Sequence, residues 1–307
     1  MRVTDAMMFN SALNNLSRNL EQYVEVQRQV ATGKRVTAVS DDPVGVSSSL
    51  RAKVRIAEME QYSRNIDDAK SWMGFTDNAL DQAVQLVREA RDTAVAGANA
   101  TESDDQRAAR ASQVGLIINQ LIQIGNSTYD GRHIFAGQDT QNAPFAADAD
   151  PPTTVTYSAR AGANQDIQYE VGIGTYQAVN LRGDQVFGNG DVPPTLIFQS
   201  LIKLRDDLNS GDANAISQAG GRLDELDSYL NRMLQYRAEV GTKSNALDSI
   251  KANLTKATQD LSQVRSNVED VDMAEAITTL QQRENVYQAS MLATARIASL
   301  SLTNYLT

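Results

Sequence analysis

Side chains that could support catalysis or metal binding are few and far apart in this 307-residue chain. The absence of cysteine excludes disulfides, thiolate metal ligands and cysteine nucleophiles. His133 is the only histidine, so no histidine pair exists for a metal, and a serine–histidine triad would have to use this residue. A lone histidine in a glycine-rich loop is far more often structural or solvated than a base. The sequence therefore predicts no catalytic, cofactor-binding or metal-binding residues, and a protein that is not an enzyme.

Two other patterns only weakly indicate a binding site, one for phosphate and one for calcium. Gly33-Lys34 is the only Gly-Lys step, but the upstream glycine of a phosphate-binding loop is missing because position 28 is arginine. A helix cap is the better interpretation of Gly33. Asp148, Asp150 and Asp191 lie in loops rich in proline and glycine, where lone acids are usually solvated and a calcium site is only weakly indicated.

Charge and hydropathy exclude several classes of partner. The net charge of −10 disfavours nucleic acid or an anionic membrane as the main partner. No stretch approaches the roughly 18 apolar residues of a membrane span, so we expect no membrane insertion. The segment from Met1 to Leu20 lacks the apolar run of about 7–15 residues found in a Sec signal. If the protein is secreted, we expect another export route.

The elements that position these residues are long helices, and the clearest is predicted from Asn214 to Asp272. One residue in seven is apolar along it: Leu226, Met233, Val240, Leu247, Leu254, Leu261 and Val268. Seven residues make two helical turns, so this column lies along one face of a helix. At about 1.5 Å per residue the helix would be about 90 Å long. So narrow an apolar stripe requires a partner.

A second register of matching length supplies that partner. Apolar and small residues alternate at spacings of three and four through Met59, Ile66, Met73, Leu80 and Val87. The register continues through Gly74, which predicts one helix over Pro43 to Ala98. Its start is indicated by Asp42 as a cap and Pro43 in the first helical position. We expect the two long helices to form an antiparallel rod whose core contains these two columns.

The two ends of the chain carry apolar faces of their own. The N-terminal pattern predicts an amphipathic helix that ends at Gly33, with apolar residues Leu13, Leu16, Leu20, Tyr23 and Val30. A last helix, from about Met273, is apolar over much of its circumference and includes Ile277, Leu280, Tyr287, Met291, Leu302 and Leu306. Such residues are ordinarily core. No other segment looks long enough to bury the last helix, so we predict an assembly interface between subunits.

The middle of the chain is different. Ser103 to Gln106 has capping-box spacing and starts a shorter helix, and a further short helix is predicted from Leu196 to Asn209. Between them the strand period replaces the helical one. We predict a mainly α fold, a long antiparallel helical rod with nested terminal helices. Its domains would be 1–35 with 273–307 (assembly), 36–141 with 195–272 (rod) and 142–194 (a small β-rich outer insert).

The residues at the joints resemble the bacterial flagellin superfamily. The resemblance rests on Leu13 to Val36 with its Ala-Thr-Gly-Lys-Arg-Val turn, Ser40 to Gly45, and Val264 to Leu306 with Glu-Asp-Val-Asp-Met-Ala at 269–274. Within the superfamily, Arg2 to Thr4, the Asp-Pro-Val-Gly at 42–45 and Asp130 to Gly137 are closer to the branch at the hook–filament junction than to filament flagellin. The insert carries little of the resemblance.

This resemblance implies a structural subunit of the flagellum, outside the cell, exported through the flagellar type III apparatus. It implies a ring of identical subunits between the preceding hook-associated protein and the first flagellin subunits. It also implies an export chaperone on the C-terminal helix. The terminal helices would form the inner tubular layer, and the insert would face outward.

Three alternatives remain open from the sequence. A short filament flagellin would extend filaments by self-polymerisation, whereas a junction protein would form a limited ring. A secreted coiled-coil adhesin or effector would bind a host ligand through the insert. An enzyme that uses the acids of the insert is disfavoured, because no constellation of groups converges there.

Overall fold

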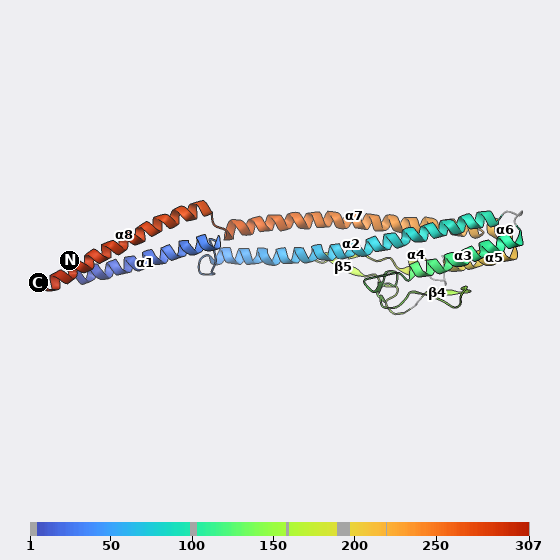
Figure 1. Cartoon of the computed structure of the whole chain (residues 1–307), viewed down its shortest axis with the longest axis horizontal. Coiled ribbons are helices and arrows are strands. Elements are labelled where there is room, and N and C mark those ends of the chain that lie inside the picture. The colour runs from blue at the N-terminus through green and yellow to red at the C-terminus, as the bar shows by residue number, and fades with distance from the viewer. Residues whose placement is uncertain (1–4, 99–102, 158–159, 189–196, 219, 307) are drawn as a thin grey trace. The chain divides into compact units, whose positions relative to one another are not determined.

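The chain divides into two compact units in a computed structural model that describes residues 5–98, 103–157, 160–188, 197–218 and 220–306. The terminal unit comprises Met1–Glu58 and Lys256–Thr307, and the central unit comprises Met59–Thr255. Long helices dominate both units, and within the described residues the small strands all lie in the central unit (Figure 1). The predicted mainly α fold is confirmed. The sequence division differs, because it placed 36–58 and 256–272 with the rod.

The helix predicted from Pro43 to Ala98 is confirmed as α2, Pro43–Gly97. Its first residue is the proline, and the Asp42 carboxylate caps it by accepting from the Gly45 N–H at 2.8 Å. Gly74 lies inside the helix with no atom close to where a Cβ would be. The helix continues because the apolar register on both sides is unbroken, and tertiary packing outweighs the low helix propensity of one glycine.

The start predicted for the other long helix, Asn214, is wrong. A five-residue helix, α6 (Ala213–Ser217), comes first, and its Asp212 cap accepts from the Ala215 N–H at 3.0 Å. The C-cap residue of α6, Gln218, is extended, with φ −66° and ψ 158°. Gly220 has a φ of 77°, a left-handed conformation that glycine adopts at no steric cost. The long helix α7 therefore begins at Arg222 and ends at Glu269.

Within the central unit, α2 and α7 run antiparallel. Ion pairs join Asp67 to Lys251 at 2.5 Å and Arg91 to Asp227 at 2.6 Å, so the early part of α2 lies beside the later part of α7. The predicted rod columns supply much of one apolar cluster: Ile66, Met73, Leu80, Val87, Leu226, Met233, Val240 and Leu247 are all buried. Leu254 packs partly buried against this cluster, whereas Met59, Leu261 and Val268 are half-buried and contribute to no part of it that the structure describes.

Two shorter helices complete the helical part of the central unit. The helix α3 (Asp104–Gly125) begins with the predicted capping box, in which Ser103 and Gln106 each accept from the backbone N–H of the other. It packs against α5 (Ile197–Ser210). Val114, Ile118 and Leu121 of α3 are fully buried in the same cluster as α2 and α7.

The segment between α3 and α5 forms three small antiparallel hairpins. They are β1 (Thr128–Tyr129) with β2 (Arg132–His133), β3 (Phe145–Ala147) with β4 (Val155–Tyr157), and β5 (Gln168–Gly172) with β6 (Thr175–Ala178). A short helix, α4 (Gly183–Val186), follows. Each sheet has two strands, which are too few to bury a core.

The hairpins instead pack onto the helices through aromatic rings. The Phe145 ring lies 5.2 Å from those of Phe187 and Phe198, centroid to centroid. Phe198 belongs to α5, and all three rings lie in the cluster that includes α2 and α7. The insert therefore shares the core of the central unit.

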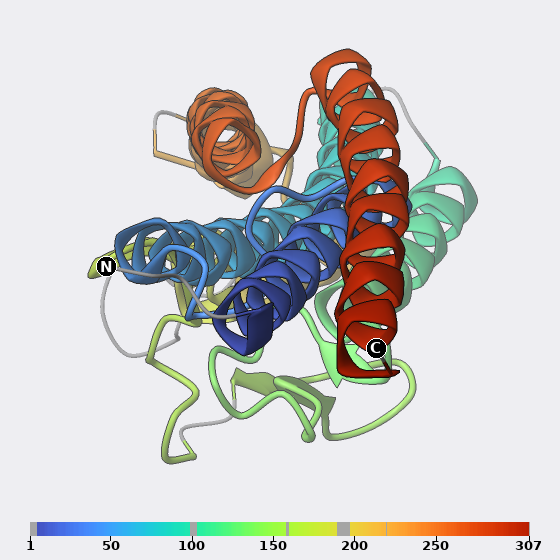
Figure 2. The ribbon, with the colours of Figure 1, turned by 90° about the vertical axis from the view of Figure 1, so that its left-hand side faces the viewer.

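The terminal unit contains the two end helices, α1 (Asp5–Thr32) and α8 (Met273–Leu306), which lie side by side (Figures 1 and 2). Gly33 directly follows α1 with a φ of 68°, as expected of a left-handed C-terminal cap. Its N–H donates to the Gln29 carbonyl at 2.8 Å. The predicted N-terminal helix and its end are confirmed.

Candidate assembly site in the terminal unit

Among the described side chains, the contacts that join α1 and α8 include an aromatic stack and two hydrogen bonds. The rings of Tyr23 and Tyr287 stack with centroids 6.1 Å apart and planes 7° apart. The Asn19 amide donates to the Ser290 hydroxyl at 2.6 Å. The Arg283 guanidinium donates to the Gln22 amide oxygen, also at 2.6 Å. In each contact one side chain belongs to α1 and the other to α8, so residues of the two helices themselves hold the helices together.

The pairing leaves much of the apolar surface of the terminal unit exposed. Only four apolar residues are buried among those described there: Val36, Ala52, Ile56 and Ala276. The large exposed ones outnumber them and include Met7, Leu13, Leu20, Val24, Leu50, Val54, Ile277, Val286, Met291 and Leu292. Scattered exposed apolar residues are normal, but a concentration of this kind marks an interaction surface.

The residues predicted to form the interface divide into two groups. Leu13, Leu20, Ile277 and Met291 are between 41% and 45% exposed. Leu16, Tyr23, Val30, Leu280 and Tyr287 are half-buried, and of these the structure brings Tyr23 and Tyr287 together. Leu302 and Leu306 belong to α8, but their side chains lie outside the described part.

A polar cluster lies where the terminal helices meet the long ones. The Glu269 carboxylate accepts from Lys53 Nζ at 2.8 Å, from Lys34 Nζ at 3.2 Å and from the Ser49 hydroxyl. Lys34 follows α1, Ser49 and Lys53 belong to α2, and Glu269 is the last residue of α7. We call these four residues the Glu269 clamp. It joins three segments that are far apart in the chain.

The carboxylate of the Glu269 clamp is held in its charged form. Glu269 is 8% exposed, and burial by itself raises the pKa of a carboxyl group. Hydrogen bonds from Lys53, Ser49 and Lys34 outweigh this effect and lower the pKa of Glu269 to about 2. The charge stays in a nearly buried position because two ammonium groups and a hydroxyl replace water around it.

Backbone hydrogen bonds reinforce the clamp. The Arg35 N–H donates to the Glu269 carbonyl at 2.7 Å, and the Val271 N–H donates to the Gly33 carbonyl at 3.1 Å. The connector that leaves α1 and the connector that enters α8 therefore pair as a short antiparallel bridge between Lys34 and Asp270. The ends of α1 and α8 are fixed beside each other by this pairing.

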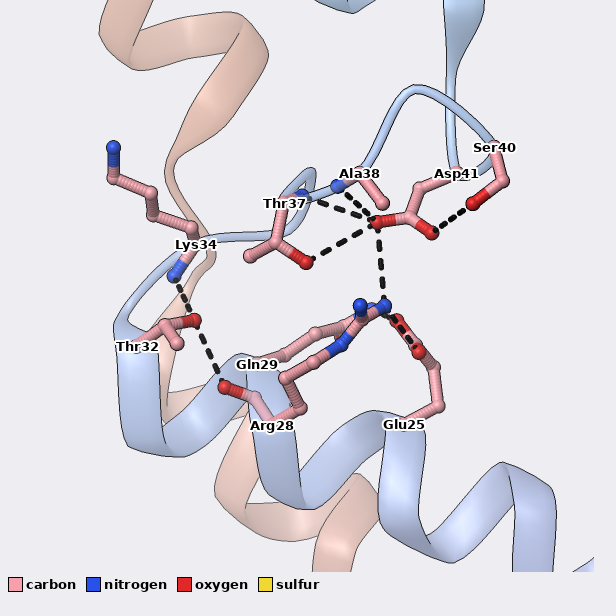
Figure 3. Close-up of polar contacts among 9 residues, drawn as sticks. All are labelled: Glu25, Arg28, Gln29, Thr32, Lys34, Thr37, Ala38, Ser40 and Asp41. Atoms are coloured by element: carbon pink, nitrogen blue, oxygen red, sulfur yellow. Dashed lines mark hydrogen bonds and ion pairs between the residues drawn. The ribbon is translucent and has the colours of Figure 1, made fainter.

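The rest of the link from α1 to α2 folds around Asp41, as Figure 3 shows. One carboxylate oxygen accepts from the backbone N–H groups of Thr37 and Ala38, at 3.1 and 2.9 Å, and from Arg28 at 3.2 Å. These hydrogen bonds, of which those from the Ala38 and Thr37 N–H groups are strongest, lower the pKa of Asp41 to about 2. In this loop the Asp41 carboxylate accepts hydrogen bonds from backbone N–H groups that carbonyl groups would accept in a helix or sheet.

Sequence reasoning missed the clamp. The sequence places Lys34 in a turn and Glu269 in the Glu-Asp-Val-Asp-Met-Ala segment, and assigns neither a partner. The only sequence signal was an acid at the end of a long helix, where the negative helix end disfavours it. Such a residue requires local cations, but the sequence does not say which lysine supplies them.

The residues considered for chemistry have structural roles. His133 Nδ1 lies 2.7 Å from the Asn126 carbonyl, Asp148 accepts from the Thr153 and Thr154 N–H groups, and Asp150 lies beside Asn119. Asp191, like Arg2 to Thr4, is outside the described residues. In the described part, no three acidic or histidine side chains gather as metal ligands would. Among the described residues, none of the helices is long and apolar enough to cross a membrane.

Known proteins are similar to this chain in sequence and in fold. The model of the bacterial flagellin N-terminal helical region matches residues 3–140, and that of the bacterial flagellin C-terminal helical region matches residues 223–306. Flagellar hook-associated protein 3 of Escherichia coli is 26% identical, over 98% of each chain.

Two solved structures are also similar. A flagellar hook-associated protein of Vibrio parahaemolyticus has a TM-score of 0.67 at 17% identity, and the match covers 75% of this chain and 100% of that one. The flagellar junction protein of Legionella pneumophila has a TM-score of 0.58 at 15% identity, with 74% and 100% covered. These likenesses show the fold. With both terminal helical regions matched and the same helical fold, the chain belongs to the bacterial flagellin family.

Proposed function

We propose that this protein is a structural subunit of the bacterial flagellum that forms the junction between hook and filament. One observation carries the proposal: the described part of the terminal unit buries four apolar residues and exposes many more. A surface of this kind is stable only when other molecules cover it, because exposed apolar area costs roughly 25 cal/mol per Å². The match to hook-associated protein 3 over nearly the whole chain favours the junction over the filament.

The α1–α8 pair is the assembly element of this proposal. Leu13, Leu20, Ile277 and Met291 face other subunits, and Leu302 and Leu306 extend the same helix. The Tyr23–Tyr287 stack joins the two helices, so that their exposed residues are presented by one helix pair. The role is structural and involves no catalytic step.

The partners follow from the family. Copies of the chain form a ring between the preceding hook-associated protein and the first flagellin subunits. The exposed apolar residues of α8 also fit an export chaperone that covers this helix before assembly, and the protein functions outside the cell. The domain division that serves this role is a terminal assembly region, a helical rod and an outward-facing 142–194 segment.

Removal of the terminal helices tests the proposal. We expect a chain that lacks 1–35 and 273–307 to keep the folded central unit, whose core it leaves intact, and to fail to join filament to hook. Cells that lack the gene should make hooks and shed flagellin into the medium. Normal filaments in either strain would overturn the proposal.

Filament flagellin is the second candidate, because the matching models describe flagellin helical regions. Purified protein distinguishes the two. A junction subunit added to flagellar hooks should form a layer of limited length, whereas a flagellin should extend into filaments. Growth of long filaments from the purified chain would favour the second candidate.

A further inference from the structure

The two apolar columns of the central unit do not by themselves define how α2 and α7 align along their length. The α2 column repeats every seven residues, through Ile66, Met73, Leu80 and Val87. The α7 column has the same repeat, through Leu226, Met233, Val240 and Leu247. A shift of one helix by seven residues would again place apolar column against apolar column. Helix pairs with such repeats need a second feature to select one alignment.

Among the described residues of the central unit, three ion pairs between the two helices belong to one alignment. Lys70 pairs with Asp248, Asp67 with Lys251 and Arg91 with Asp227. From one pair to the next, the α2 residue moves toward its C-terminus by as many positions as the α7 residue moves toward its N-terminus. This is the pattern of a single antiparallel alignment. Arg237 conforms too, because it lies between two acids of α2, 3.0 Å from Asp77 and 2.6 Å from Asp81.

The charges that flank this pair of acids are cations. Seven residues before Asp77 is Lys70, and seven residues after Asp81 is Arg88. In the observed alignment Arg237 meets two acids. After a shift of seven residues in one direction it would lie between Lys70 and Gly74, and in the other between Val84 and Arg88. Both shifts exchange two attractive contacts for one repulsive contact.

The other ion pairs agree. The shift toward Arg88 would bring Asp248 opposite Asp77, a second repulsive contact, and would leave Asp67 and Lys70 opposite threonines. The reverse shift would leave Asp67 opposite Ser244 and Asp227 opposite Val84, and its only new attraction is between Lys251 and Glu60. We propose that this pattern of charges, centred on Arg237, selects the alignment of α2 and α7 by penalising the two seven-residue shifts that the apolar columns allow.

The function of these charges is selection more than stability. Their side chains are between 29% and 55% exposed, and pairs at that exposure stabilise a fold only slightly. The difference between alignments is larger than the gain from any one pair, because several attractions disappear as repulsions appear. This inference concerns the central unit alone and does not depend on the proposed function.

A distance measurement in the full-length chain tests it. The chain has no cysteine, so spin labels can be placed at Gln82→Cys and Asn253→Cys, two exposed positions on α2 and α7. A shift of seven residues changes their separation by about 10 Å. The labelled protein with all its other residues unchanged should show a single population of distances between the two labels.

Charge reversal of Arg237 supplies the decisive variant. In Arg237→Asp the observed alignment becomes repulsive at Asp77 and Asp81, whereas the shift toward Lys70 becomes attractive. We expect a second population about 10 Å longer at low salt. Lys256→Asp, the same charge change at an exposed position of α7, should keep the single distance. A single unshifted distance in Arg237→Asp would overturn the inference.

A milder variant covers the case in which Arg237→Asp loses its helical signal. Arg237→Gln with Asp248→Asn removes attractions without adding repulsion. A shifted minor population in this folded variant supports the selection of alignment by charge. One unshifted population would show that the core and the turns fix the alignment alone, and would overturn the proposal.

Discussion

Tyr23 and Tyr287 stack with their ring planes 7° apart, although 264 positions of the chain separate them. The contact joins the first helix to the last, and few buried apolar residues support it. The first and last helices of the chain are therefore joined by two half-buried side chains.

Substitution of Tyr23 by alanine should loosen the α1–α8 pair. A stacked aromatic pair contributes about 1 kcal/mol beyond the area that it buries, so amide exchange in both helices should accelerate by about fivefold. Tyr23→Phe keeps the ring and should keep the protection. Tyr176→Ala removes a ring that is 60% exposed in the central unit and provides the control. Equal exchange rates in Tyr23→Ala and the unsubstituted protein would contradict the role of the stack.

Glu269→Gln should destabilise the terminal unit in a pH-dependent manner. The folded pKa of Glu269 is about 2 against an ordinary value of 4.5, so its charge stabilises the fold above pH 4.5. That contribution is lost as the pH falls from 4.5 to about 2. At pH 7 we expect a loss of about 1.5–3 kcal/mol, as for hydrogen bonds to charged groups.

Thermal unfolding of the two proteins at pH 7, 4.5 and 2.5 measures this difference. The difference in unfolding temperature between the two proteins should become smaller as the pH falls. Glu21→Gln alters an exposed carboxylate of α1 and should show no comparable difference. If Glu269→Gln lowered the unfolding temperature equally at pH 7 and pH 2.5, the charge of Glu269 would not be the source of the stabilisation.

Two glycine substitutions should have opposite signs. Gly33 has a φ of 68°, so alanine there should cost about 1 kcal/mol through backbone strain alone, since no atom lies near its Cβ position. Gly74 is exposed within α2, and alanine there should stabilise the protein by about 0.5–1 kcal/mol. Chemical denaturation checks both values. The same sign at the two positions would argue against the assigned conformations.

Phe145→Ala should destabilise the helices as well as the hairpin that contains it. Its ring is 2% exposed and contacts Phe187 and Phe198, so its removal should cost about 3–5 kcal/mol. Because the hairpins share the helical core, the helical signal at 222 nm should be lost at a lower temperature. Ile173→Ala, at a position 69% exposed in the same segment, should leave the transition in place. An unchanged helical transition in Phe145→Ala would mean that the segment folds separately.

The local features of this fold could be predicted from the sequence, because neighbouring residues encode them. The seven-residue columns predicted both long helices, and Ser103 with Gln106 predicted the start of α3. The break before Arg222 was missed, since the apolar pattern continues across Gly220, whereas the backbone leaves the helical conformation at Gln218, which is extended, and at Gly220, which is left-handed. At Gln218 and Gly220 the conformation of the backbone, and not the period of the apolar side chains, determined where the helix stops.

The sequence by itself determined the periodicity, the caps and the exposed apolar character of the two ends, because each is a property of residues within a few turns of one another. Only the tertiary structure decided which distant residues meet. It brought Lys34, Ser49 and Lys53 around Glu269, packed Phe145 into the helical core, and placed Arg237 between two acids of α2. Contacts of this kind depend on the alignment of whole helices, and an apolar column that repeats every seven residues allows more than one alignment.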